Sequence, residues 1–179
     1  GVEITGIARA VDRWVVEDAR SSSGDASRTS TRLQWMNRVE STLSNDNNNI
    51  ATSLTKVYTS ADLLTADANN PTLRAQFLQA IEEVATGFRT TATQLTDIAQ
   101  GVTNTATAEV NLFNGELQAL EEINAGLRKA RAGSTNQASL MDRRDQLIDQ
   151  LSAKGGINVS FDNRGAATVR ASDSGELLL

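Results

Sequence analysis

The stretch that decides the fold begins Thr72-Leu-Arg-Ala-Gln-Phe-Leu-Gln-Ala-Ile-Glu-Glu-Val-Ala-Thr-Gly-Phe88 and keeps one pattern to about Arg131. Its apolar residues recur at steps of three and four, which places them on one face of an α-helix. About sixty residues at 1.5 Å rise predict a helix of roughly 90 Å, with coiled-coil-like packing. The stripe is formed by Phe77, Ile81, Val84, Phe88, Leu95, Ile98, Val102, Ala106, Val110, Phe113, Leu117, Leu120, Ile123 and Leu127.

Three glycines, Gly87, Gly101 and Gly115, are spaced 14 residues apart within this stretch and therefore share one helix face. A glycine inside a helix costs about 1 kcal/mol relative to alanine. Either that cost is simply tolerated, or a neighbouring helix approaches closely on this face.

Before the long helix, Asn70-Pro71 predicts a break, because a residue before proline avoids helical geometry and proline suits the first helical position. Residues 31–65 carry a heptad seam interrupted by Glu40 and Asn47, and we expect one helix here, with a possible kink at 45–49. Residues 2–8 predict an extended segment in which Val2, Ile4 and Gly6 alternate with Glu3 and Thr5. Residues 12–20 predict a short helix capped by Asp12. Residues 21–27 predict a polar loop.

After the long helix, residues 132–136 predict a tight turn, and Thr135 or Asn136 is expected to cap a helix that ends near Ala153. Its buried side is expected to hold Met141, Leu147, Ile148 and Leu151. Residues 157–161 and 167–171 alternate as two strands joined by a turn at 162–165, and a second turn at 172–175 leads toward Leu177 and Leu179.

The fold class is therefore mainly α: an elongated antiparallel bundle of long helices with the start of a small β-subdomain. We expect a rod domain over residues 1–155, which includes the extended N-terminal segment, and an incomplete β-subdomain over residues 156–179. The first and last residues lie within patterned sequence, so we expect the chain to be an internal piece of a longer protein.

Composition narrows the function classes. A formal net charge of −5 in 179 residues argues against nucleic acid as a partner, and no apolar run is long enough to predict a membrane span. The chain has no His and no Cys, so the commonest catalytic base and the thiol nucleophile are missing from this sequence. We expect no catalytic residue, metal site or cofactor, and therefore no enzyme.

The charged helix Asn136-Gln-Ala-Ser-Leu-Met-Asp-Arg-Arg-Asp-Gln-Leu-Ile-Asp-Gln-Leu-Ser152 is the densest group of candidates for chemistry. Its carboxylates at i, i+3 and i+7 would share a face and could in principle hold a metal or work as an acid–base pair. Interhelical ion pairs that fix the register of the helices are the favoured interpretation. The register candidates are Asp142, Arg143, Arg144, Asp145 and Asp149.

The chain resembles the bacterial flagellar hook-associated protein 1 family, the hook–filament junction proteins, over nearly its whole length. The most specific resemblance lies in residues 140–148 with Leu151-Ser152, although Arg143 stands where the family often has Gln. The other matching features are residues 1–7, Arg9, residues 11–15, residues 69–71, Arg74, residues 77–78, Asn111, Asn124, residues 157–161, Gly165 and Val169. Asn111 and Asn124 join the register candidates on this ground, and the family's terminal coil regions are absent from both ends.

This resemblance implies a structural subunit that joins hook to filament as a ring-forming adaptor. The implied partners are the hook protein, the second hook-associated protein and further copies of itself, with no nucleic acid or membrane. It also implies an extracellular place in the flagellum after type III export without a cleaved signal, while the isolated chain should be mainly monomeric. Two alternatives stay open: another axial subunit, such as the second hook-associated protein or a flagellin-like protein, and a secreted coiled-coil adhesin.

Overall fold

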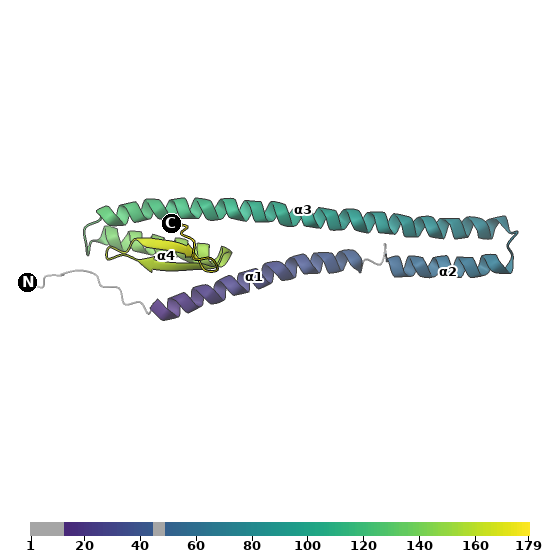
Figure 1. The fold of residues 1–179 in the computed structure, drawn as a ribbon, viewed down its shortest axis with the longest axis horizontal. Helices are drawn as coiled ribbons and strands as arrows, with labels where there is room; N and C mark the ends of the chain where they lie inside the picture. The colour runs from purple at the N-terminus through teal and green to yellow at the C-terminus, as the bar shows by residue number, and fades with distance from the viewer. Residues whose placement is uncertain (1–12, 45–48) are drawn as a thin grey trace, which may run out of the picture. The chain divides into compact units, whose positions relative to one another are not determined.

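A computed structural model describes residues 13–44 and 49–179 of the chain. The predicted extended segment at residues 2–8 and the Asp12 cap lie outside these residues. Figure 1 shows long helices and a small sheet near the C-terminus, which confirms the mainly α fold class. The elements are α1 (Arg13–Leu43), α2 (Ile50–Ala66), α3 (Pro71–Lys129), α4 (Thr135–Lys154), β1 (Ile157–Phe161) and β2 (Ala167–Ala171).

The chain forms two compact units. The first contains residues 1–31 and 106–179, and the second contains residues 32–105. Both α1 and α3 continue from one unit into the other, because each helix passes a boundary without a break. The core, the sheet and the contacts of each unit are described separately below.

Helix α1 runs straight through the segment predicted as a polar loop, so the loop at residues 21–27 was wrong. Ser is only a moderately poor helix former, and a single glycine is tolerated inside a helix. Gly24 has a packing reason to be there: a Cβ atom at this position would lie 2.7 Å from the carbonyl oxygen of Ser152. The glycine thus permits close approach of α1 to α4, and tertiary packing outweighs the local signal.

The single helix predicted over residues 31–65 is also wrong, because α1 ends at Leu43 and α2 begins at Ile50. Asn49 is extended, with φ −65° and ψ 104°, and its side chain accepts a hydrogen bond from the backbone N–H of Thr52 at 3.2 Å. Asn is among the best N-cap residues because its oxygen satisfies an amide that the first helical turn leaves unpaired. The cap therefore starts a new helix, although the apolar seam stays in phase on both sides.

The predicted break before the long helix is confirmed. Pro71 is the first residue of α3, and the Asn70 side chain accepts hydrogen bonds from the N–H groups of Thr72 and Leu73 at 3.0 and 3.4 Å. At the start of α4 the prediction missed by one residue. Ser134 is the N-cap, and its hydroxyl accepts from the N–H of Gln137 at 3.2 Å.

The core of the first unit lies where α3, α4 and the sheet meet. Its six buried residues come from all three: Leu117 and Leu120 from α3, Ile148 and Leu151 from α4, and Ala167 and Val169 from β2. Leu147 packs against this cluster while partly buried, and Met141 is also half-buried. The predicted apolar side of α4 is thus confirmed in position, with Ile148 and Leu151 fully buried.

Strands β1 and β2 pair antiparallel, with Val159 opposite Val169 at the centre. Asp162 forms the turn between them: its Oδ1 accepts from the N–H groups of Arg164 at 2.8 Å and Ala166 at 2.9 Å. Gly165 takes φ +86° in this turn, which favours glycine. After the second turn, Leu177 forms an isolated bridge with Arg170, so the chain returns along β2 as predicted.

In the second unit, α3 lies beside the end of α1 and beside α2 (Figure 1). Close approach at a glycine is confirmed at Gly101, where a Cβ atom would lie 3.1 Å from Cη2 of Trp35. Gly87 is buried, whereas a Cβ at Gly115 would meet nothing within 4 Å. Close approach is therefore confirmed at Gly101 and is wrong for Gly115, while Gly87 is buried.

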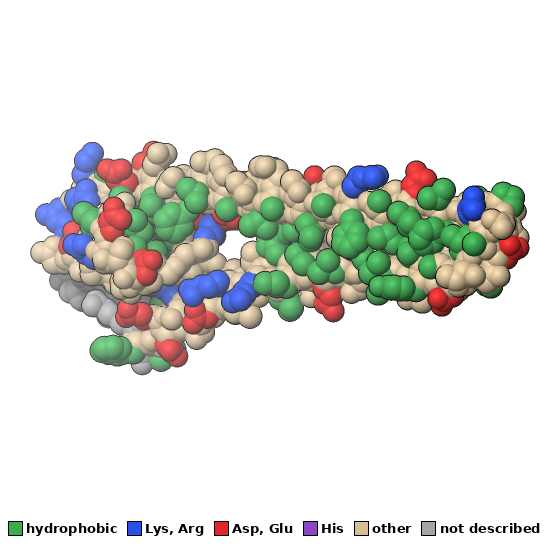
Figure 2. All heavy atoms as spheres, turned by 45° about the vertical axis from the view of Figure 1, so that its right-hand side comes forward, with side chains coloured by type: hydrophobic (Ala, Val, Ile, Leu, Met, Phe, Trp, Pro, Cys, Tyr) green, Lys and Arg blue, Asp and Glu red, His purple; other side chains and the backbone are tan. Residues whose placement is uncertain are grey.

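A pair of packed helices leaves much of each helix exposed to solvent, and this is so in the second unit. Its described residues bury only Ala80, Gly87 and Thr91, and α2 has no buried residue. Figure 2 shows a band of hydrophobic side chains over α2 and the neighbouring part of α3. The large exposed hydrophobic residues of α2 and this part of α3 are Leu54, Tyr58, Leu63, Leu78, Ile81 and Phe88.

Candidate functional site

The carboxylates predicted on one face of α4 have different surroundings. Asp149 accepts a hydrogen bond from Nε of Arg20 on α1 at 2.7 Å, which forms an ion pair between two helices. Asp142 is exposed, and Asp145 is half-buried. Asp149 therefore joins α4 to α1 by an ion pair.

Arg144 is the most enclosed charge of the predicted group, with its side chain 10% exposed. Its Nη2 and Nε donate to Oδ1 of Asp145 at 2.6 and 2.9 Å. Its Nη1 donates to the carbonyl oxygen of Gly165, and its Cζ lies 4.2 Å from the centre of the Phe161 ring. The expectation of an interhelical ion pair is wrong for Arg144. The Phe161 ring and the Gly165 carbonyl hold its guanidinium over the hairpin, and the carboxylate that it contacts there belongs to Asp145 of the same helix.

Asn124 of α3 acts as a substitute for a neighbouring strand. Its side chain is 1% exposed, its Nδ2 donates to the carbonyl oxygen of Ala167 at 2.8 Å, and its Oδ1 accepts from the Ala167 N–H at 2.7 Å. Both polar groups of one β2 residue are thereby satisfied by one amide, as a strand partner would satisfy them. Asn124 therefore fixes where β2 sits on α3.

The remaining two candidates take no part in this arrangement. Arg143 on α4 and Asn111 on α3 are both exposed. The structure thus brings Asn124, Arg144 and Asp145 together around the hairpin and joins Asp149 to α1. The role of all these residues in helix register stays a prediction.

Sequence reasoning missed the polar residues at the hairpin tip. Arg164 donates to the carbonyl oxygen of Arg128, close to the end of α3, where helix carbonyls lack partners within the helix. Gln137 accepts from the N–H of Gly133 at 2.8 Å and donates to the Arg164 carbonyl at 3.4 Å. The Asp-x-x-Gly turn was the available signal, but its partners on α3 and α4 are far away in sequence.

Asp162 has a pKa below its usual value of 3.8. The largest cause is the hydrogen bond from the Ala166 N–H; the N–H groups of Arg164 and Gly165 and the charge of Arg128 act in the same direction. Partial loss of hydration opposes them. The ionised carboxylate is favoured because it accepts several N–H groups at once, which is a turn-forming role.

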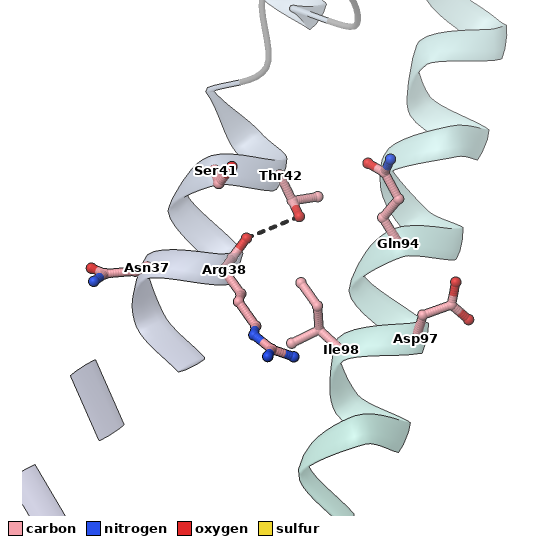
Figure 3. Close-up of a pocket in the computed structure, with 7 residues that line it drawn as sticks. All are labelled: Asn37, Arg38, Ser41, Thr42, Gln94, Asp97 and Ile98. Atoms are coloured by element: carbon pink, nitrogen blue, oxygen red, sulfur yellow. Dashed lines mark hydrogen bonds between the residues drawn. The ribbon is translucent and has the colours of Figure 1, made fainter. Parts of the chain in front are cut away.

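The described residues contain no group of three or more acidic, His or Cys side chains that could hold a metal ion. In the second unit, Asn37, Arg38, Ser41, Thr42, Gln94, Asp97 and Ile98 line an open hollow of about 450 Å³. Figure 3 shows that Gln94 and Ile98 face α1, while the Asp97 carboxylate points away from it. Nothing in this hollow pairs a base with a nucleophile.

None of the described helices is both long enough and apolar enough to cross a membrane. Around the hairpin, the side chains of Asn124, Arg144 and Arg164 donate to backbone carbonyl oxygens, and these bonds help to position the hairpin on α3 and α4.

Comparison with known proteins agrees with this arrangement. The model of the flagellar hook-associated protein FlgK helical domain matches residues 36–179. Flagellar hook-associated protein 1 of Escherichia coli (strain K12) is 26% identical over 172 residues, and that of Salmonella typhimurium is 25% identical over 168 residues. These alignments cover 94% and 92% of this chain but only 31% and 30% of the relatives, so the chain spans less than a third of their length.

The fold has a counterpart among solved structures. The flagellar hook junction protein FlgK from Burkholderia pseudomallei matches with a TM-score of 0.81 and 20% sequence identity, covering 91% of this chain and 28% of that one. At this identity the match concerns the fold. The family model, in contrast, covers well over half of the chain. The chain therefore belongs to the family of the flagellar hook-associated protein FlgK, whose helical domain it carries over residues 36–179.

Proposed function

We propose that this chain is the helical part of a structural subunit that joins hook to filament in a bacterial flagellum. The observation that carries the proposal is the match of residues 36–179 to the FlgK helical domain. The names of the curated relatives support it, since both are flagellar hook-associated protein 1. In this role the subunit would form a ring that adapts a flexible hook to a stiff filament.

The proposed role requires a fixed arrangement of helices and requires no catalysed reaction. A junction subunit must keep its helices in a fixed register while it contacts neighbouring subunits. The buried Asn124–Ala167 contact and the enclosed Arg144 side chain support such a role, because both tie a helix to a strand or turn distant in sequence. We infer that the protein is not an enzyme and takes no cofactor.

The proposed partners follow from the same role. They are the hook protein on one side, the second hook-associated protein on the other, and further copies of the subunit in the ring. The protein would act outside the cell, after type III export without a cleaved signal. The isolated chain is expected to be mainly monomeric, and a stable ring detected by light scattering would overturn that expectation.

Deletion of the gene that encodes this chain tests the function. Cells without it should build hooks, release unpolymerised flagellin into the medium and fail to swim. Electron microscopy of the cell surface and immunoblots of the medium provide the readouts, and the intact gene in trans is the control. Normal filaments on the deleted cells would refute the proposal.

The register role proposed for the charged face of α4 has its own test. Arg20→Asp and Asp149→Arg each place like charges together across α1 and α4, and the double variant restores opposite charges. A partly exposed pair of this kind contributes about 0.2–1 kcal/mol, so each single change should lower stability and motility modestly. Recovery in the double variant supports the role, whereas additive losses would contradict it.

A further inference from the structure

Both helices that continue from one compact unit into the other are exposed where they do so. The boundary between the units falls between residues 31 and 32 of α1 and between residues 105 and 106 of α3. Every residue of 28–34 in α1 and of 102–112 in α3 is exposed. At 1.5 Å per residue, the exposed part of α3 is about 16 Å long, or roughly three turns.

This exposure includes apolar side chains of the kind that reach the core further along the same helix. Val110 and Leu112 are more than half exposed, whereas Leu117 and Leu120 are buried in the core of the first unit. Most of the stability of helices in proteins comes from packing of an apolar face. Residues 102–112 therefore depend on their own local preferences to remain helical.

Those local preferences are weak. The segment reads Val-Thr-Asn-Thr-Ala-Thr-Ala-Glu-Val-Asn-Leu, and seven of its eleven residues are Val, Thr or Asn. All three rank below Ala, Leu and Glu as helix formers, because a β-branched side chain loses rotamer freedom in a helix and Asn competes for backbone hydrogen bonds. Glycines flank the segment at positions 101 and 115, and the exposed part of α1 contains Thr29-Ser-Thr31. Intrinsic propensity therefore does not replace the missing packing.

Side-chain hydroxyl groups also compete for helix carbonyls at both places. Thr103 Oγ1 donates to the Ala99 carbonyl oxygen at 3.2 Å, and Thr29 Oγ1 donates to the Asp25 carbonyl oxygen at 2.8 Å. Hydrogen bonds of this kind slightly destabilise helices and often bend them. Two of them occur earlier in α3, at Thr93 and Thr96, where the helix also has buried and half-buried side chains.

We propose that residues 102–112 of α3 and residues 28–34 of α1 form a hinge at which the two units tilt relative to each other. Both helices bend at these segments, because bending there lengthens a few exposed backbone hydrogen bonds and leaves the core of the first unit intact. Motions of whole units about such a hinge take microseconds to milliseconds. The hinge does not depend on the proposed junction role; in that role it would let each subunit adapt to neighbours of different stiffness.

Amide hydrogen exchange measured by NMR on the full 179-residue chain tests the local weakness of α3. Amides of residues 103–112 should exchange about tenfold faster, or more, than those of residues 117–127 in the same helix. A triple variant that combines Thr103→Ala, Thr105→Ala and Thr107→Ala raises the helix propensity of the hinge. It should slow exchange at residues 103–112 by about fivefold or more.

The matched control makes the same chemical change elsewhere in α3. A triple variant that combines Thr86→Ala, Thr93→Ala and Thr96→Ala alters three exposed residues of the second unit. It should leave exchange at residues 103–112 within about twofold of the unaltered chain, because distant substitutions act independently.

Residual dipolar couplings from the weakly aligned chain test the tilting itself. Couplings from α4 and the hairpin report on the first unit, and couplings from α2 and residues 71–99 report on the second. We expect the two sets to require alignment tensors of different magnitude, and the variant altered at Thr103, Thr105 and Thr107 to bring the two magnitudes together. One tensor that fits both units of the unaltered chain would overturn the hinge. Slow exchange at residues 103–112 in the unaltered chain, or equal effects of the two triple variants, would also overturn it.

Discussion

Asn124→Ala is the most informative single change, because one side chain satisfies both backbone groups of Ala167. Asn124 and Ala167 are 1% and 4% exposed, so water does not replace the lost partner without rearrangement. A buried donor or acceptor left unsatisfied costs about 1–3 kcal/mol, and one N–H and one C=O are left here. Allowing for partial relaxation, we expect a loss of about 2–4 kcal/mol in the stability of the first unit.

Native-state hydrogen exchange is the suitable assay, since the two compact units need not unfold together. A loss of 2–4 kcal/mol should accelerate exchange at Val169, in the centre of β2, by about 30- to 1000-fold. Asn111→Ala on the same helix is the matched control, because Asn111 is exposed and the change should stay within about 0.5 kcal/mol. Equal effects of the two substitutions would refute the role assigned to Asn124.

Two further predictions concern a glycine contact and a turn. Gly24→Ala would place a Cβ atom 2.7 Å from the Ser152 carbonyl oxygen and should destabilise the packing of α1 on α4 by about 1–3 kcal/mol. In Gly115→Ala the new Cβ atom meets nothing within 4 Å, so this change should stabilise α3 by up to about 1 kcal/mol. Urea unfolding followed by circular dichroism compares them, and shifts in the same direction would contradict this account. Folding lowers the pKa of Asp162 from 3.8, so the contribution of the ionised carboxylate to stability should be complete above about pH 3.8 and should disappear as the pH falls through the lowered pKa. The difference in stability between the unaltered chain and Asp162→Asn should therefore shrink over that pH range. A difference that does not depend on pH would argue against the Ala166 hydrogen bond as the cause of the lowered pKa.

The sequence predicted most of the elements because their signals are local. The break at Asn70-Pro71 and the turn that starts at Asp162 involve side chains that bond to backbone groups within a few residues. The alternation in β1 likewise reports burial on one face. Such patterns survive in almost any tertiary context, which is why the helix and strand bounds agree with the structure to within a few residues after residue 66.

The failures occurred where distant contacts compete with local signals. The serine-rich segment around Gly24 remains helical because α1 packs on α4 there, and the in-phase seam concealed the helix start that the Asn49 cap creates. For the candidate site, the sequence identified Arg144 as notable but misjudged its partners. The Phe161 ring and the Gly165 carbonyl lie 17 and 21 residues further along the chain, so no spacing rule indicates them.

The sequence by itself determined that this chain is mainly helical, where the last two helices and both strands lie, and to which family it belongs. Periodicity and composition are sufficient for the helices and strands, since these follow from which faces must be buried, whereas the family rests on the resemblance of specific motifs and on the match of residues 36–179 to the family model. Only the tertiary structure decided that Asn124 completes the outer edge of β2 and that Asp149 pairs with Arg20. These properties depend on the directions of individual backbone and side-chain groups, which are set when elements distant in sequence pack together.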